Sequence, residues 1–166
     1  MAVAFFIGRF QPFHKGHLKD IQRALDECEK VIIAIGSSQE QGTINNPFSY
    51  KQRKKMIQLT LGDEHIEKNK YEIIAIPDIN NNDLWVRHVE SLCPKFDVIY
   101  TGNALVKKLF LLKKYKVVDI ELFQNINSTK IREKILDEKE WKNLVPNTVS
   151  KYLEDIDGED IIKNII

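Results

Sequence analysis

A length of 166 residues is enough for one domain with a sizeable hydrophobic core. Hydrophobic residues make up 43% and charged residues 30% of the chain, a globular balance that excludes a largely disordered protein. The net charge of +1 indicates no nucleic-acid partner, so any affinity for anions has to arise from a local cluster of residues.

The cysteines and the apolar runs favour a cytoplasmic protein. Cys28 and Cys93 match no metal-binding or redox spacing, which is typical of reduced thiols. The apolar run at residues 3–7 is far too short for a membrane span and lacks the basic leader of a signal peptide. We therefore expect a cytoplasmic location and no membrane partner.

Short apolar runs rich in valine and isoleucine recur along the chain without polar alternation, as in strands buried on both faces of a parallel sheet. They lie at residues 2–7, 31–35, 72–76, 97–100 and 116–120. Segments with helical spacing separate them. This order predicts an α/β fold with a doubly wound, Rossmann-like, mostly parallel sheet and helices on both faces.

Helix starts are indicated by capping patterns. The first helix is expected to begin near Gly16. Ser49 and Gln52 form a capping-box pattern at the start of the second helix. Asp83 and Asn103 are the expected N-caps of the next two helices.

The last quarter of the chain has helical patterns only. From Ser128 onward we expect helices that are broken near Pro146 and Gly158. The sequence contains no internal repeat, low-complexity tract or linker. We therefore predict a single domain over residues 1–166, with a helical C-terminal part from about residue 128.

The stretch GRFQPFHKGHL, residues 8–18, joins the first strand to the first helix. Glycines at both ends of this loop let a ligand approach the backbone. A helix start offers unpaired N–H groups and the positive end of the helix dipole. His14 and His17 can converge there and donate hydrogen bonds to phosphate oxygens, while Arg9 and Lys15 add positive charge.

The same loop has alternative interpretations. It lacks the lysine–serine ending of the Walker loop and the three-glycine dinucleotide fingerprint. The two histidines could instead form a metal pair or serve a structural role. Neither a carboxylate nor a third histidine has matching spacing nearby, so a nucleotide-phosphate site is the favoured interpretation.

The second cluster is INSTKIR, residues 126–132. Ser128 or Thr129 is expected to cap the following helix and leave its N–H groups directed outward. Arg132 lies one turn further on, so this helix start suits a second phosphate group. Taken alone, the cluster is better explained by a capped helix with a surface arginine. Together, the two clusters favour anion binding.

GRFQPFHKGH and INSTKIR together resemble the paired signatures of the nucleotidyltransferase superfamily of small α/β adenylyl- and cytidylyltransferases. The first signature is matched throughout, whereas the second departs at Asn127, where serine or glycine is usual. Within that superfamily the chain resembles the archaeal-type nicotinamide-nucleotide adenylyltransferases. The resemblance extends through IGSSQ (35–39), NPFSYKQR (46–53), DINNNDLWV (78–86), YTGNALV (100–106) and WKNLVP (141–146).

The resemblance implies roles for individual residues. It implies catalytic roles for His14, His17 and Arg132. It implies ATP binding by Gly8, Arg9, Phe10, His14, Gly16, His17, Gly102, Asn103, Ser128, Thr129 and Arg132. It implies binding of nicotinamide mononucleotide (NMN) by Ser37, Arg53, Asp78, Asn82 and Trp85. We assign no residue as a dedicated metal ligand.

Residue chemistry permits the NMN roles but leaves alternatives open. The indole of Trp85 could stack on a pyridinium ring, while Asn82 and Asp78 could recognise the carboxamide and the ribose hydroxyls. Trp85 could equally pack into the core. Arg53 could bind the NMN phosphate or be a solvated charge.

The resemblance implies adenylyl transfer from ATP to NMN, which yields NAD and pyrophosphate. Mg²⁺ is expected to bridge the phosphates with few protein ligands. The resemblance also implies a homo-oligomer, with a hexamer as one candidate. Two alternative functions remain open. One is nucleotidyl transfer to another acceptor, such as pantetheine phosphate, flavin mononucleotide or an alcohol phosphate, and the other is non-catalytic nucleotide sensing.

Overall fold

The computed structural model describes residues 1–165 and divides the chain into two compact units. We call the first the sheet unit; it comprises residues 1–8, 20–38 and 68–121. We call the second the helical unit; it comprises residues 9–19, 39–67 and the chain from residue 122 onward. The single domain inferred from the sequence stays a prediction.

The sheet unit is built on five parallel strands in the order β3-β2-β1-β4-β5. Each strand lies within two residues of its predicted bounds. The strands are β1 (Val3–Gly8), β2 (Lys30–Gly36), β3 (Tyr71–Ile76), β4 (Val98–Thr101) and β5 (Lys116–Asp119). The predicted Rossmann-like parallel sheet is therefore confirmed.

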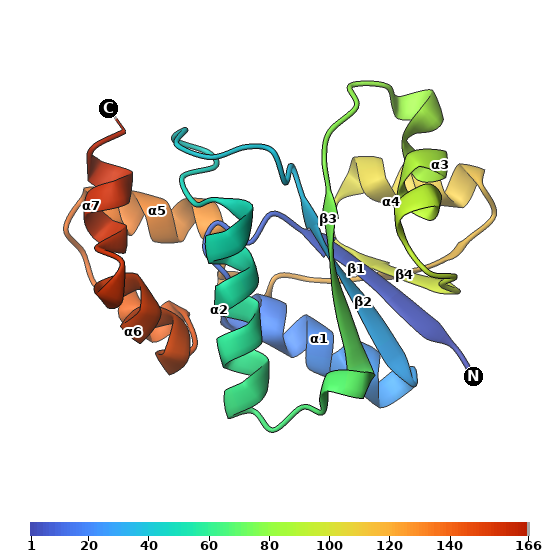
Figure 1. Ribbon diagram of the computed structural model, residues 1–166, viewed down its shortest axis with the longest axis horizontal. Helices are drawn as coiled ribbons and strands as arrows, with labels where there is room; N and C mark the ends of the chain where they lie inside the picture. The colour runs from blue at the N-terminus through green and yellow to red at the C-terminus, as the bar shows by residue number, and fades with distance from the viewer. Residues whose placement is uncertain (166) are drawn as a thin grey trace. The chain divides into compact units, whose positions relative to one another are not determined.

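Helices connect the strands in two opposite directions from the centre of this sheet. Helix α1 (Lys15–Glu27) leads from β1 to β2, whereas α3 (Asn82–Leu92) and α4 (Ala104–Leu112) lead to β4 and then to β5. Because such crossovers are right-handed, α1 and the α3–α4 pair cover opposite faces. Figure 1 shows α3 and α4 side by side on one face, where Phe110 of α4 packs on Phe5 at a ring-centroid distance of 5.5 Å.

The strand order reverses between β1 and β4, which is where open α/β sheets bind ligands. Gly102 follows β4 directly. A Cβ atom at this position would lie 2.7 Å from the carbonyl oxygen of Ile120, so only glycine fits against the segment after β5.

The helical unit contains α2 (Tyr50–Asp63), α5 (Ser128–Leu136), α6 (Asn147–Asp155) and α7 (Gly158–Lys163). Helix α6 packs against α2 and α7, and α5 packs against α7 (Figure 1). The expected capping box of Ser49 and Gln52 is present at the start of α2. The predicted breaks near Pro146 and Gly158 are confirmed, because α6 and α7 begin at these points.

Two predicted N-caps are wrong. Helix α3 is capped by Asn81, whose side chain accepts the N–H of Leu84, while Asp83 lies within the first turn. Helix α5 is capped by Asn127, and the hydroxyl of Ser128 is used elsewhere. In both cases an asparagine one or two residues upstream has the extended backbone that a cap requires. The prediction for Asn103 is confirmed, since its side chain accepts the N–H of Val106.

Within residues 1–165, none of the helices combines the length and the apolar character that crossing a bilayer requires.

Candidate functional site: an anion-binding loop

In the helical unit, three carbonyl groups of the loop at residues 9–12 accept hydrogen bonds from side chains of two helices. The guanidinium of Arg53, on α2, donates to the carbonyl oxygen of Arg9 at 3.1 Å. From α5, Arg132 donates to the carbonyl oxygen of Gln11 at 2.8 Å, and the Ser128 hydroxyl donates to that of Pro12 at 2.9 Å. These bonds occupy the acceptors of the loop and hold it against both helices.

His14 and His17 form a reciprocal pair at the start of α1. Their rings stack with centroids 3.5 Å apart. Nδ1 of His17 accepts the backbone N–H of His14 at 3.1 Å, and Nδ1 of His14 accepts the backbone N–H of His17 at 3.3 Å. Because Nδ1 acts as an acceptor in both rings, the proton of each neutral ring is carried by Nε2. Each histidine can thus present an N–H donor to an anion.

Burial keeps this histidine pair neutral. It lowers the pKa of His14 from 6.5 to about 4, and it lowers the pKa of His17 well below its usual value, with a further contribution from His14. Phe10 and Phe13 contact the His17 ring at centroid distances of 4.7 and 5.4 Å. Phe10 has a positive φ of 55°, which is uncommon for a bulky residue. Two aromatic side chains of the loop therefore pack against the His17 ring.

Gly16 makes room for the His14 ring. A Cβ atom at Gly16 would lie 2.9 Å from Cε1 and 3.0 Å from Nδ1 of that ring. Any other residue would push the imidazole aside. The sequence interpretation gave this glycine a different purpose, namely room for a ligand at the helix start.

Three arginines concentrate positive charge around the same loop. Arg53 is fully buried and Arg132 is 8% exposed, while Arg9 is exposed. Burial, together with a smaller contribution from the charge of Arg9, lowers the pKa of Arg53 to about 10. The pKa of Arg132 is lowered by the same two causes in the same order. Like charges held this close favour the binding of a polyanion.

The alternative interpretation of Arg53 as a solvated charge is wrong, because the side chain is fully buried. Besides Arg9, its guanidinium donates to the carbonyl oxygens of Ser49 at 3.3 Å and Glu40 at 3.2 Å. Its proposed contact with the NMN phosphate stays a prediction.

The start of α5 places the second motif beside the first. Asn127 Oδ1 accepts the N–H of Lys130 at 2.8 Å, and Thr129 Oγ1 lies 3.4 Å from an Arg132 donor. The departure at Asn127 therefore preserves the cap. Together, the helical unit brings Arg9, Phe10, His14, Gly16, His17, Arg53, Ser128, Thr129 and Arg132 around one loop.

The remaining predicted site residues belong to the sheet unit. All lie at or just beyond the carboxyl ends of its strands. Gly8 ends β1, Ser37 follows β2, Asp78 and Asn82 follow β3 with Trp85 in α3, and Gly102 and Asn103 follow β4. The N–H of Ser38 donates to the carbonyl oxygen of Ile76 at 3.2 Å, which joins the ends of β2 and β3.

Trp85 packs against a core residue on one side, as its alternative interpretation expects. Its ring meets Phe110 edge-on at a centroid distance of 5.6 Å, and the residue is half-buried. Asp78 and Asn82 are exposed. The NMN roles of these three residues stay predictions.

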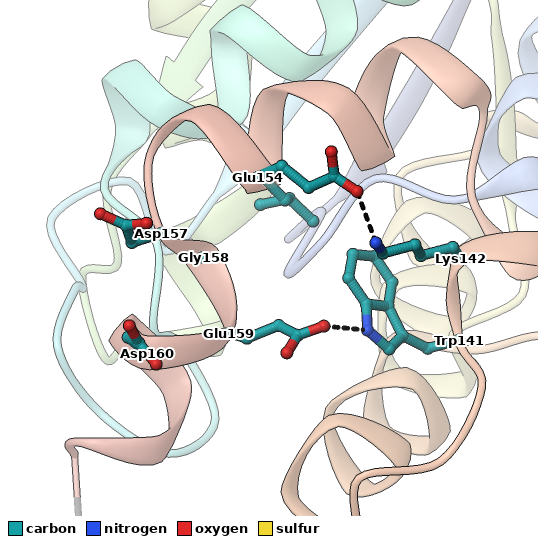
Figure 2. Close-up of a pocket in the computed structure, with 8 residues that line it drawn as sticks. Trp141, Lys142, Glu154, Asp157, Gly158, Glu159 and Asp160 are labelled. Carbon is teal, nitrogen blue, oxygen red and sulfur yellow. Dashed lines mark hydrogen bonds and ion pairs between the residues drawn. The ribbon is translucent and has the colours of Figure 1, made fainter.

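A separate cavity of about 270 Å³ lies among the C-terminal helices of the helical unit (Figure 2). Figure 2 shows Lys142 paired with Glu154, and Trp141 Nε1 donates to Glu159 Oε1 at 2.7 Å. Asp157 and Asp160 add further negative charge to the lining. This cavity has the wrong charge for a phosphate.

The arginine guanidinium groups and N–H groups around the loop do not ligate metal ions, and the Nδ1 atoms of His14 and His17 already accept backbone N–H groups. Within residues 1–165 we find no cluster of three or more His, Cys, Asp or Glu side chains that could hold a metal ion. Mg²⁺ commonly takes its ligands from substrate phosphates and water, with few protein side chains.

Sequence reasoning gave no role to Gln11, although it lies inside the first motif. Its side chain makes two hydrogen bonds to the backbone of Phe48, which lies 37 residues away in the chain. No local pattern could have indicated such a distant partner.

The chain belongs to the cytidylyltransferase-like family, which it matches over residues 5–134. It is 46% identical over 164 residues to a nicotinamide-nucleotide adenylyltransferase from Thermoplasma acidophilum, covering 98% of this chain and 90% of that protein. It is 42% identical over 160 residues to the protein of the same name from Thermococcus sibiricus, covering 95% of this chain and 86% of that protein.

Solved structures give the same result. A bifunctional NMN adenylyltransferase/ADP ribose pyrophosphatase from Francisella tularensis superposes with a TM-score of 0.80 at 28% identity, covering 98% of this chain. This chain spans about half of that protein, 53% of its length. A second structure with the same description, complexed with AMP and a Mn ion, has a TM-score of 0.77 at 28% identity.

These relatives confirm the predicted family and its class of reaction. The chain is a nucleotidyltransferase of the kind that transfers an adenylyl group to NMN. The assignment of individual site residues stays a prediction.

Proposed function

We propose that this protein transfers the adenylyl group of ATP to nicotinamide mononucleotide and releases NAD and pyrophosphate. The observation that carries the proposal is the loop at residues 9–17, around which two neutral histidines and three arginines gather. Such a loop suits a triphosphate, because it offers fixed N–H donors and positive charge.

The donors of the helical unit are assigned to the phosphates of ATP. Nε2 of His14 and His17 donates to phosphate oxygens, and Arg132 supplies the charge that stabilises the departing pyrophosphate. Ser128 and Thr129 contribute the N–H groups of the α5 start. Arg9, Phe10 and Gly16 shape the loop, and Gly8, Gly102 and Asn103 are assigned to ATP by family resemblance.

The NMN roles are proposed on the same resemblance. Arg53 is assigned to the mononucleotide phosphate, and Trp85 to the pyridinium ring. Ser37, Asp78 and Asn82 are assigned to the ribose and the carboxamide. Support comes from the positions of Ser37, Asp78 and Asn82 just beyond the carboxyl ends of β2 and β3, where α/β sheets bind ligands.

The reaction needs no general base. The 5′-phosphate of NMN is largely ionised at neutral pH, since the second pKa of a phosphate monoester is roughly 6. One of its oxygens forms a bond to the α-phosphorus of ATP, while the bond from that phosphorus to the β-phosphate bridging oxygen breaks. Pyrophosphate leaves with the electron pair. Catalysis then consists of aligning two anions and stabilising the developing charge.

We also propose Mg²⁺ as the divalent ion, bridging the phosphates with few protein ligands. The bound ion would neutralise part of the charge on the triphosphate. The protein would orient the phosphates around it through His14, His17 and Arg132.

The proposal is tested by the initial rate of pyrophosphate release from ATP and Mg²⁺ with a panel of acceptors. The panel contains NMN, nicotinate mononucleotide, pantetheine phosphate, flavin mononucleotide and glycerol phosphate. We expect rapid release with NMN and NAD as the product. Pyrophosphate release only with a non-pyridine acceptor would contradict NMN as the substrate. ATP binding without any pyrophosphate release would favour a nucleotide sensor.

Two further properties are proposed. The protein is a cytoplasmic homo-oligomer, with a hexamer as the candidate size. Support for self-association comes from Leu105, Leu111 and Leu112 of α4, which are 48%, 49% and 69% exposed. Light scattering at several protein concentrations gives the mass, and a monomer at all concentrations would overturn the proposal.

A further inference from the structure

Gln11 forms a two-point clamp on the backbone of Phe48. Its Nε2 donates to the carbonyl oxygen of Phe48 at 3.0 Å, and its Oε1 accepts the N–H of Phe48 at 2.9 Å. Gln11 is 1% exposed and Phe48 is fully buried. One side chain therefore satisfies both the N–H and the carbonyl group of Phe48. Because both residues are buried, water cannot readily replace these two hydrogen bonds.

The clamp lies next to a second connection between the same two segments. Phe48 directly precedes Ser49, the N-cap of α2, and Arg53 lies one turn further on. Arg53 donates back to the carbonyl oxygen of Arg9 at 3.1 Å. Residues 9–11 and 48–53 are thus joined twice, once through the Gln11 side chain and once through the Arg53 guanidinium.

The backbone of Gln11 extends this arrangement to a third segment. Its carbonyl oxygen accepts a hydrogen bond from Arg132 of α5 at 2.8 Å. Its side chain therefore reaches towards the start of α2, while its main chain is held by the group assigned to the departing pyrophosphate. Gln11 therefore contacts Phe48, just before α2, through its side chain and Arg132 of α5 through its main chain.

We infer that Gln11 is a positioning residue, which sets the distance between the phosphate loop and the start of α2 that carries Arg53. This inference rests on the proposed function. Losing the clamp would let the start of α2 shift relative to the loop, while His14, His17 and Arg132 stay in place. Because a misplacement of about 1 Å can cost roughly 100-fold in rate, alignment suffers more than ATP binding does.

The Gln11→Met variant tests the inference, because methionine has a similar length and volume but makes neither hydrogen bond. We expect kcat to fall roughly 10- to 100-fold, with the KM for ATP within about threefold of wild type. Gln58→Met is the matched control, since Gln58 is an exposed residue of α2. It is expected to leave both constants unchanged.

Two results would overturn the inference. One is a kcat within twofold of wild type in folded Gln11→Met protein. The other is a raised KM for ATP at unchanged kcat, which would make Gln11 an ATP-binding group. Should Gln11→Met fail to fold, Gln11→Asn takes its place, because this amide is one methylene too short to reach both groups of Phe48.

Amide hydrogen exchange separates this inference from the proposed function. The Phe48 amide should exchange faster in Gln11→Met than in wild type, whether or not the protein makes NAD. Unchanged exchange of that amide contradicts the clamp. Absence of NAD formation by the wild type contradicts the proposed function instead.

Discussion

His14 and His17 determine each other's tautomer. Each ring accepts the backbone N–H of the other residue through Nδ1, at 3.1 and 3.3 Å, while the two rings stack 3.5 Å apart. The spacing of three residues at the start of α1 makes this possible. Neither imidazole can turn over without breaking the hydrogen bond that it makes to its neighbour.

The first prediction concerns the protonation of this pair. In the free protein, both rings should be neutral Nε2–H tautomers at pH 7, and His14 should gain a proton only near pH 4, because burial disfavours the charged form. Nitrogen-15 NMR of the ring nitrogens, followed from pH 8 to pH 4, measures the tautomer of each ring and the pH at which His14 is protonated. A His14 midpoint near 6.5 would contradict the burial argument.

The second prediction concerns His17 and Arg132, which are assigned to stabilise the negative charge that develops on the phosphates of ATP. His17→Ala and Arg132→Ala should each reduce kcat by about 100-fold or more, since a single well-placed donor contributes about that much to such reactions. Steady-state kinetics with ATP and NMN gives the values. Near-wild-type turnover in either folded variant would remove that residue from the catalytic set.

The third prediction uses the space that Gly16 leaves. Gly16→Ala places a methyl group where the His14 ring lies, 2.9 Å from Cε1, so the ring has to move. We expect kcat to fall at least tenfold while the protein stays folded. Gly62→Ala is the control, because Gly62 lies in α2 with no atom within 4 Å of the added methyl. Equal turnover in both variants would mean that the His14 position is unimportant.

The fourth prediction concerns the cap of α5. Asn127→Ala removes the acceptor of the Lys130 N–H and should lower stability by about 1 kcal/mol, or roughly 2–4 °C in Tm. Asn127→Ser restores a good cap and should recover most of that loss. Thermal unfolding of the three proteins is the measurement. If alanine and serine behave alike, Asn127 does not act as the cap.

The fifth prediction concerns Asp20 in α1, a half-buried carboxyl group. Burial, partly offset by the charge of Arg23, raises its pKa from 3.8 to about 7. The folded state then binds a proton more tightly than the unfolded state, so stability is lost as pH rises from about 4 to 7. Because the group is only partly buried, Asp20→Asn should stabilise the protein by about 1 kcal/mol at pH 8, a discounted value.

At pH 4, the same substitution should have little effect, because the carboxyl group is protonated in the folded state. Urea unfolding of both proteins at pH 4 and pH 8 gives the comparison. The histidine pair produces the opposite slope below its usual pKa, but it is present in both proteins and cancels in the difference. An equal gain at both pH values would contradict the raised pKa of Asp20.

Local sequence patterns predicted much of this protein. The valine- and isoleucine-rich runs indicated all five strands, because strands buried on both faces are apolar throughout. The Ser49–Gln52 capping box and the Asn103 cap were predicted because their partners lie within three residues. The two loop motifs indicated the family, since their chemistry lies in contiguous residues.

The sequence pattern was not sufficient to choose the N-cap where two neighbouring residues could both cap a helix. Serine and threonine are good caps, yet Asn127 caps α5 and Ser128 instead donates to Pro12. Likewise Asn81 caps α3 in place of Asp83. The choice depends on backbone angles set by the preceding segment and on a partner far away in the chain.

The amino-acid sequence by itself determined the parallel α/β sheet, the phosphate-loop motif and the family. Tertiary structure alone decided that Arg53 is buried beneath the loop and that Gln11 clamps Phe48. It also decided that Gly16 makes room for His14. The physical reason is range: hydrophobic periodicity and capping act over a few residues, whereas these contacts join segments that only packing brings together.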